Sequence, residues 1–133
     1  MCIRDSYYFN LTESFLSSNH SESLIIFNKI LKEGFDGHHF IIGLSAHFRD
    51  LLVCKDEATV ELLEVSGGVK ERYAEQAKKA SLSFLLSALN ISALCDQGYK
   101  TSKNQRLHVE LTLMKIAHLQ DAIQLADEIK KKD

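Results

Sequence analysis

One long helical segment near the end of the chain most constrains the fold. Residues 104–129 contain no Gly and no Pro, and apolar side chains recur there at helical spacing. The main stripe consists of Leu107, Leu111, Met114, Leu119, Ile123 and Ala126, with Val109, Leu113 and Ile116 on the flank beside it. As one helix the segment would be about 40 Å long, which exceeds the width of a small domain. We therefore expect part of this helix to pack against something outside its own fold.

The composition favours helices in the rest of the chain as well. The chain has 133 residues, of which 45% are hydrophobic, and it contains no Pro and no Trp. This length is enough for one domain with one core. Strands would need more Val and Thr, together with turn pairs such as Asn-Gly. We predict an all-α fold, a compact bundle of about six or seven helices that ends in the one long helix.

Capping signals predict the ends of the first helices. A short amphipathic helix is expected over residues 8–17, and Asn19 is placed to cap the next helix, which Gly34 closes. Asp36 is in position to cap a third helix that runs to about Lys55. Asp56 is expected to cap a further helix of one or two turns.

Two helices are predicted between the glycine pair at residues 67–68 and the long terminal helix. Residues 69–79 form a charged outer helix that turns Val69, Tyr73 and Ala77 inward. Ser81 caps the next helix, which ends near Gly98 and is expected to be among the most buried through Leu82, Leu85, Leu86, Leu89, Ile91 and Leu94. The long helix is capped either by Ser102, in a capping box with Gln105, or by Asn104.

The domain is expected to cover residues 7–129. Residues 1–6 fit no periodic pattern and are predicted to be a leader outside the domain, and residues 130–133 to be a frayed end or the start of a linker. Beyond Leu119 the apolar spacing resembles a short coiled-coil seam over Ile116, Leu119, Ile123 and Ala126.

The charge balance argues against several classes of partner. Sixteen Lys and Arg against eighteen Asp and Glu give a net charge of −2, so no excess of positive charge favours a nucleic-acid backbone. No apolar run approaches the roughly 20 residues that cross a bilayer, and the start lacks the pattern of a signal peptide. We expect a cytoplasmic domain without direct nucleic-acid or membrane contact.

No pattern of residues indicates catalysis, so we predict no catalytic, cofactor-binding or metal-binding residues in this segment. The glycine pair at residues 67–68 lacks the Lys and Ser or Thr of a phosphate-binding loop. His38, His39 and His47 form the one local histidine cluster, but their spacing does not place three ligands on one helix face. A small helical metalloprotein or enzyme that uses them is the weakest hypothesis. Cys2, Cys54 and Cys95 are far apart, and the latter two are expected to act as small buried hydrophobes.

Three runs, in this order and spacing, resemble a known family. They are residues 34–37 (GFDG) leading into Phe40 and Ile41, residues 47–52 (HFRDLL), and residues 104–107 (NQRL) followed by Glu110 and Leu111. Together with residues 62–65 and 71–73, they resemble the third, C-terminal collar domain of the gamma/tau subunit of bacterial DNA polymerase III over about residues 8–119. Gln105 stands where this family often has Pro.

The resemblance implies a role in assembly. In that family the collar is an all-helical domain that joins clamp-loader subunits into a ring, while ATP hydrolysis belongs to two preceding domains. It therefore implies that this segment is not itself an enzyme, and that ATP and magnesium bind elsewhere. It also implies partners among the collar domains of other clamp-loader subunits, in a homo- or hetero-oligomer that loads the sliding clamp during DNA replication.

Two groups of residues are the candidate subunit interface. The polar positions expected to set the register are Arg49, Asp50, Arg106 and Glu110, and the positions expected to provide burial are Leu107, Leu111 and Met114. Arg106 and Glu110 are one helical turn apart and can form an ion pair. Burial of the apolar three within the chain and burial against another subunit are both open at this stage. The alternative function is a free-standing helical adaptor that binds a partner peptide or helix in a groove.

Overall fold

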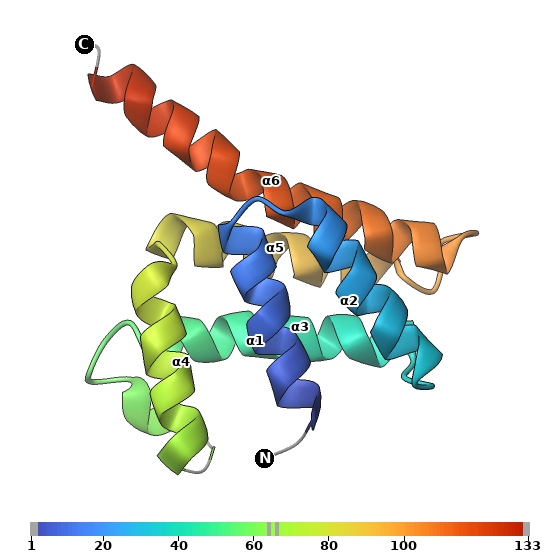
Figure 1. Ribbon diagram of the computed structural model, residues 1–133, viewed down its shortest axis with the longest axis horizontal. Coiled ribbons are helices and arrows are strands. Elements are labelled where there is room, and N and C mark those ends of the chain that lie inside the picture. The colour runs from blue at the N-terminus through green and yellow to red at the C-terminus, as the bar shows by residue number, and fades with distance from the viewer. Residues whose placement is uncertain (1–2, 64, 66, 132–133) are drawn as a thin grey trace.

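The computed structural model describes residues 3–63, 65 and 67–131, and these form six α-helices and one short 3₁₀ helix with no strand among them (Figure 1). The elements are α1 (Ile3–Leu16), α2 (His20–Lys32), α3 (Gly37–Val53), the 3₁₀ helix η1 (Val60–Leu62), α4 (Gly67–Lys79), α5 (Leu82–Gly98) and α6 (Gln105–Lys131). The all-α fold that ends in one long helix is thus confirmed. Cys2 and residues 132–133, for which predictions were made, lie outside the described residues.

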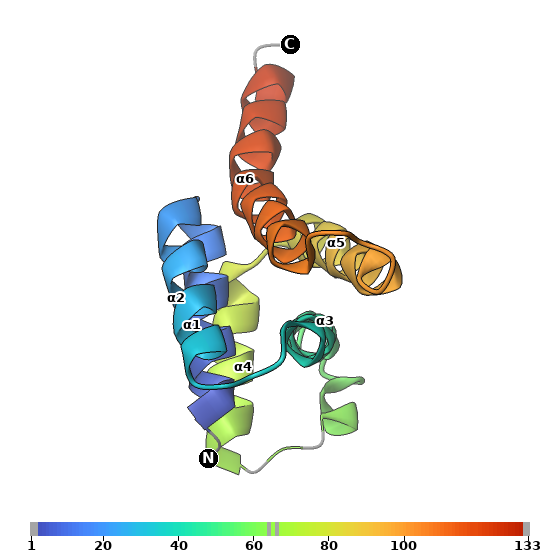
Figure 2. The same ribbon diagram turned by 90° about the vertical axis from the view of Figure 1, so that its right-hand side faces the viewer.

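The helices lie in two layers. Helices α1, α2 and α4 run side by side in one layer, whereas α3 and α5 cross behind them in the other (Figures 1 and 2). The first half of α6 packs on α5 and also contacts α1 and α2. One hydrophobic core lies between the layers, and its largest fully buried side chains are Phe15, Phe27, Phe48 and Phe84.

Local capping contacts set several helix ends as predicted. The Asn19 side chain accepts a hydrogen bond from the backbone N–H of Glu22 at 3.1 Å, and Ser81 accepts one from Phe84 at 3.1 Å. Gly34 has φ +90°. Its N–H donates to the carbonyl of Leu31, while that of Phe35 donates to the carbonyl of Ile30. This pair of bonds is the Schellman motif, which glycine accommodates because it has no Cβ.

Other helix ends differ from the predictions. Helix α1 begins at Ile3 instead of residue 8. Residues 3–7 contain no Gly or Pro that would stop the helix. Asp36 holds the predicted N-cap position of α3, but it makes no capping hydrogen bond, and its carboxylate contacts the His39 ring at 3.0 Å instead. Of the two candidate caps for α6, Asn104 is the one that accepts a hydrogen bond from Leu107, at 3.0 Å.

The buried face of α5 was only partly predicted. Leu85 is fully buried, but Leu82, Leu86 and Leu94 are exposed, and the inward positions are taken by Phe84, Ala88, Ser92 and Cys95. Because α5 is apolar around most of its circumference, the spacing of its leucines does not identify the face that turns inward. For α4 the prediction is confirmed, since Val69, Tyr73 and Ala77 are all buried.

The second half of α6 extends beyond the rest of the molecule (Figures 1 and 2). Residues 124–130 are exposed, and Ile123 is the last partly buried side chain. Despite the length of α6, no helix in the described ranges is long and apolar enough to cross a membrane. We expected part of this helix to extend beyond its own fold, and residues 124–130 do so.

A buried histidine connects three helices. His47 of α3 is 2% exposed, and its Nε2 lies 2.8 Å from Oε1 of Gln76 in α4. The Gln76 amide nitrogen donates to the Phe9 carbonyl of α1 at 2.8 Å. Since Gln76 Oε1 can only accept, His47 carries its proton on Nε2, and its buried Nδ1 has no partner among the described residues. Burial lowers the pKa of His47 from 6.5 to about 4.

Helices α1 and α3 approach closely at Gly43. The Tyr8 hydroxyl of α1 donates to the Phe40 carbonyl of α3 at 3.0 Å. A Cβ added at Gly43 would overlap that hydroxyl and lie 2.6 Å from the ring carbon Cζ. The absence of a side chain at position 43 is what lets the tyrosine ring lie against the helix.

Replacing this glycine therefore tests the α1–α3 packing. Gly43→Ala is expected to lower the free energy of unfolding by about 1–3 kcal/mol, because Tyr8 must move out of a packed position. The measurement is urea denaturation followed by circular dichroism. Gly68→Ala is the matched control, since a Cβ at this exposed helical glycine meets no atom within 4 Å. Equal effects of the two substitutions would contradict the packing described.

The buried histidine predicts a pH dependence of stability. Because its pKa is about 4 in the folded chain against 6.5 unfolded, the unfolded state binds a proton between these values that the folded state rejects. Its contribution is fully present above pH 6.5 and is lost as pH falls toward 4, and the loss is roughly 2 to 3 kcal/mol by pH 4.5.

The test compares the free energy of unfolding at pH 7 and pH 4.5 for two variants. His47→Gln removes the titrating ring, so its loss of stability between the two pH values should be smaller than that of the unmodified chain by roughly 2 to 3 kcal/mol. His39→Gln, on the exposed side of the same helix, is the control. A His47→Gln variant with the same pH slope as the unmodified chain would show that His47 is not buried in its neutral form.

Candidate subunit interface

The side of α6 that faces the core is the one predicted as its flank. Val109, Leu113 and Ile116 are fully buried, together with Ala117. The predicted main stripe is divided: Leu119 and Ile123 pack partly against the core, whereas Leu107 and Leu111 are turned away from it and remain 45% and 47% exposed. The sequence left this choice open, because α6 is apolar on two sides and spacing alone does not tell which side the rest of the fold covers.

The outer side of α6 carries a mostly apolar stripe, and the rest of the chain leaves most of it uncovered, although the His118 ring within it stacks on that of His20 with centroids 5.5 Å apart. We call it the outer stripe, and it comprises Leu107, Leu111, Met114, His118, Ala122, Leu125 and Ile129. Met114 is partly buried, whereas the four residues Leu107, Leu111, Leu125 and Ile129 are among the exposed large hydrophobics of the molecule. The predicted coiled-coil seam needs correction as well, since Ile116 lies in the core and Ala126 is exposed on a different side.

A shallow groove runs beside the outer stripe. It has a volume of about 550 Å³ and is bounded by Ile91 of α5 and by Leu111, Met114, Lys115, His118, Leu119 and Ala122 of α6. Its lining is almost entirely apolar. The groove and the outer stripe thus form one continuous apolar surface on α6 and the adjoining side of α5.

The polar candidates fall into two separate pairs. Arg106 lies 3.4 Å from Glu110 in the predicted ion pair, and it also donates to the Asn28 side chain of α2 at 3.0 Å. Arg49 and Asp50 contact each other at 3.0 Å near the end of α3. The structure therefore places five of the seven predicted residues together on α6 and the other two on α3. Their roles at an interface stay predictions.

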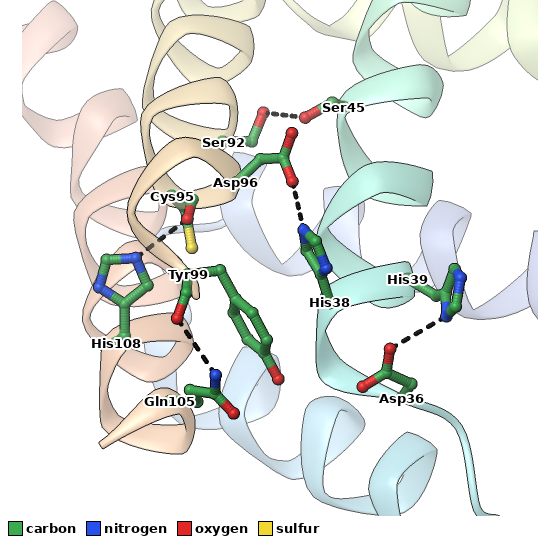
Figure 3. A network of polar contacts seen from close by, with 10 residues as sticks. All are labelled: Asp36, His38, His39, Ser45, Ser92, Cys95, Asp96, Tyr99, Gln105 and His108. Carbon is green, nitrogen blue, oxygen red and sulfur yellow. Dashed lines mark hydrogen bonds and ion pairs between the residues drawn. The ribbon is translucent and has the colours of Figure 1, made fainter. Parts of the chain in front are cut away.

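A network of polar contacts holds the start of α6 against the end of α5, and α5 against α3 (Figure 3). His108 of α6 lies 3.0 Å from the Cys95 carbonyl of α5, and the Gln105 side chain donates to the Tyr99 carbonyl at 3.2 Å. His108 also packs against Gly98, where an added Cβ would lie 3.2 Å from its ring. These contacts fix the position of the first turns of α6, and with it that of the outer stripe.

The same network joins α5 to α3. His38 Nε2 lies 2.6 Å from the Asp96 carboxylate, and its ring stacks on Tyr99 with centroids 4.7 Å apart and planes 7° apart. Burial raises the pKa of Tyr99, with a further contribution from the charge of Asp36, so the phenol stays neutral. Sequence reasoning missed Asp96 and Tyr99, because their partner is about 60 residues away and no local pattern marks the pairing.

The three histidines of the predicted cluster have structural partners. His38 contacts Asp96 and His39 contacts Asp36, while His47 is buried on Gln76. No group of three His, Cys, Asp or Glu residues within the described ranges is placed to hold a metal ion. Cys95 is buried and Cys54 partly buried, and burial raises the pKa of both thiols. Both therefore stay protonated, as expected of small hydrophobes.

Comparisons with known proteins show what the chain as a whole is similar to. A family model described as DNA polymerase III subunits gamma and tau domain III matches residues 3–131. No curated protein matches the chain. Among solved structures, the DNA clamp loader delta protein of Bacillus subtilis is similar, with a TM-score of 0.73 and 24% sequence identity over 86% of this chain and 36% of that one. The chain thus spans about a third of that protein, and at this identity the likeness concerns the fold alone.

Proposed function

The chain belongs to the domain III family of DNA polymerase III subunits gamma and tau, and on this basis we propose that it is a collar domain that joins its subunit to the other subunits of the clamp loader. In this role it holds neighbouring ATPase modules in a ring while the sliding clamp is loaded onto primed DNA. Its partners are the collar domains of the other subunits.

The outer stripe of α6 is the observation that carries the proposal. Its leucines are about half exposed although the opposite side of the first half of α6 is buried in the core, and with the groove beside α5 the stripe forms a continuous apolar surface. Contiguous apolar surfaces of this kind are typical of interaction sites. Covering them with another chain removes apolar area from water, at roughly 25 cal/mol per Å².

The firm attachment of α6 suits a mechanical role. The contacts of Gln105 and His108 with the end of α5 fix the first turns of the helix, and Arg106 ties the same turns to α2. A partner bound on the outer stripe is thereby connected to both layers of the fold. Movement of a neighbouring subunit can then be transmitted through the domain as a unit.

Nucleotide chemistry belongs to other domains in this proposal. The clamp loader needs ATP and magnesium, and we assign their binding to other parts of the gamma and tau subunits, with no cofactor and no catalytic residue in this segment. A free-standing adaptor would use the same apolar surface. The family match, which spans residues 3–131, favours the clamp loader.

The proposal predicts that a charge in the outer stripe impairs assembly without unfolding the domain. Leu111→Glu is expected to weaken binding to the other clamp-loader subunits at least tenfold, because an interfacial leucine is replaced by a carboxylate that must lose its hydration. Binding is measured by isothermal titration calorimetry, and folding by circular dichroism.

Leu62→Glu is the matched control, because Leu62 is similarly exposed, at 54%, but lies in η1, away from α6. It should leave binding unchanged. If the unmodified chain bound none of the other subunits, or if both substitutions weakened binding equally, the assignment of the outer stripe to subunit assembly would be wrong.

A further inference from the structure

A pocket bounded by aromatic side chains lies between α1, the end of α2 and the start of α3, and we infer that it binds an arginine side chain of a partner protein. We call it the aromatic pocket, and its lining includes Tyr7, Tyr8, Phe35, Asp36, His39 and Phe40. Because these residues belong to α1, α3 and the turn before α3, the inference does not depend on the outer stripe or on the proposed function. Its support comes from the size of the pocket, its rings and its hydrogen-bonding groups.

The aromatic pocket has room for one long side chain. Its volume is about 240 Å³, below the roughly 300–1,000 Å³ of pockets that hold drug-sized molecules. Ile30 and Phe40 in its lining are only 4% and 3% exposed, so its inner part is apolar, whereas Asp36 and His39 lie at the exposed rim. A side chain with an apolar stem and a polar tip matches this gradient, because the stem packs on the apolar part while the tip stays at the rim.

Aromatic rings form much of the pocket wall. Tyr8 and Phe40 lie nearly parallel, with ring centroids 5.8 Å apart and planes 17° apart, and Tyr7 and Phe35 also line the pocket. The face of an aromatic ring carries negative potential and attracts a cation, most often the guanidinium of arginine. A planar guanidinium also stacks on such a face, which the ammonium of lysine cannot do. The wall therefore favours a planar cation.

The two tyrosine hydroxyls already donate their protons within the chain. Tyr7 donates to the Glu33 carboxylate at 2.6 Å, and this bond raises the pKa of Tyr7, so the phenol keeps its proton. Tyr8 donates to the Phe40 carbonyl at 3.0 Å. A ligand that needed donors from these hydroxyls would have to break one of these bonds, whereas a ligand that brings its own donors would not.

The rim of the pocket is acidic. The carboxylate of Asp36 lies 3.0 Å from Nδ1 of His39 (Figure 3), and because an ionised carboxylate can only accept, His39 is the donor. Asp36 makes no capping bond to α3, and its side chain is 54% exposed, so it can also accept from a ligand. Glu33, bonded to Tyr7, adds a second negative charge beside the pocket. The groups at the rim thus favour a positively charged donor.

Among protein side chains, arginine fits this combination best. Its guanidinium has five N–H donors and no acceptor, and its planar shape matches both a carboxylate and a ring face. Free arginine fits less well, because its own carboxylate would lie near the negative charges of Asp36 and Glu33. An arginine inside a peptide chain has no such carboxylate. The partner is therefore a protein segment that presents an exposed arginine.

A capped amino acid tests the chemistry of the pocket. N-acetylarginine amide, titrated into the whole chain, should bind with a Kd on the order of 1 mM and shift the NMR signals of Gly34 and Phe35. N-acetylcitrulline amide has the same shape without the charge and should bind about tenfold more weakly. Free arginine should also bind more weakly. Equal binding of the arginine and citrulline derivatives, or tighter binding of free arginine, overturns the inference.

Two substitutions test the location of the site. Asp36→Asn should weaken binding of N-acetylarginine amide about tenfold, because it removes the accepting charge without removing a capping bond. Asp127→Asn is the matched control, since it removes an equal charge from the exposed second half of α6. Tyr7→Leu removes a ring that is only partly buried and should weaken binding as well. Folding of each variant is checked by circular dichroism.

The outcomes are separate from those for subunit assembly. Leu111→Glu, which tests the outer stripe, should leave binding of N-acetylarginine amide unchanged. If the folded chain does not bind this compound, or if Asp36→Asn and Asp127→Asn weaken binding equally, the inference is wrong, whatever the result with the other clamp-loader subunits. Conversely, a failure of the proposed function leaves the arginine site standing.

Discussion

The corner between α5 and α6 is the constraint on which the outer stripe depends. A helix leaves its last carbonyls without partners in its own backbone, and the carbonyl of Cys95 is one of these. His108 of the following helix satisfies it at 3.0 Å, which ties the beginning of α6 to the end of α5. Asp96 in the same last turn would oppose the helix dipole, and His38 at the start of α3 offsets this through a 2.6 Å contact. Three helices are thereby joined where the apolar surface begins.

The other polar link lies in the core. His47 and Gln76 connect α3 to α4 and, through the Phe9 carbonyl, to α1. Such a link contributes less to net stability than to the choice of one packing, because any rearrangement leaves polar atoms buried without partners. The two layers of the fold are therefore held in a single relative position on which the attachment of α6 builds.

Local features were predictable from the sequence, and choices between faces were not. Asn19 and Ser81 cap the starts of α2 and α5 as predicted, and Gly34 closes the end of α2. Such caps depend on residues only a few positions apart in the sequence. The buried face of α5 was predicted only in part, and the side of α6 that the core covers was left open, because both helices are apolar on more than one side. For Leu111 this ambiguity has a physical reason: a leucine on an exposed side of a helix has the same chemistry as one in the core.

The candidate subunit interface also combines local contacts that the sequence predicts with long-range contacts that it does not. The ion pair of Arg106 with Glu110 follows from their separation by one helical turn. The hydrogen bond from Arg106 to Asn28 joins residues 78 positions apart, so no local sequence pattern indicates it. Asp96 and Tyr99 went unnoticed for the same reason. Contacts between distant segments depend on how helices cross, and a single sequence does not record this.

The close contact of Tyr8 with Gly43 has a consequence for how this sequence can change over evolutionary time. The hydroxyl and ring of Tyr8 occupy the space that a side chain at position 43 would need, so the two sites share one volume. A homologue that acquires a larger residue at position 43 must carry a smaller one at position 8, and the substitution at 8 has to come first or together with it. Covariation between these positions is therefore expected to mark members of the family that keep the same crossing of α1 and α3.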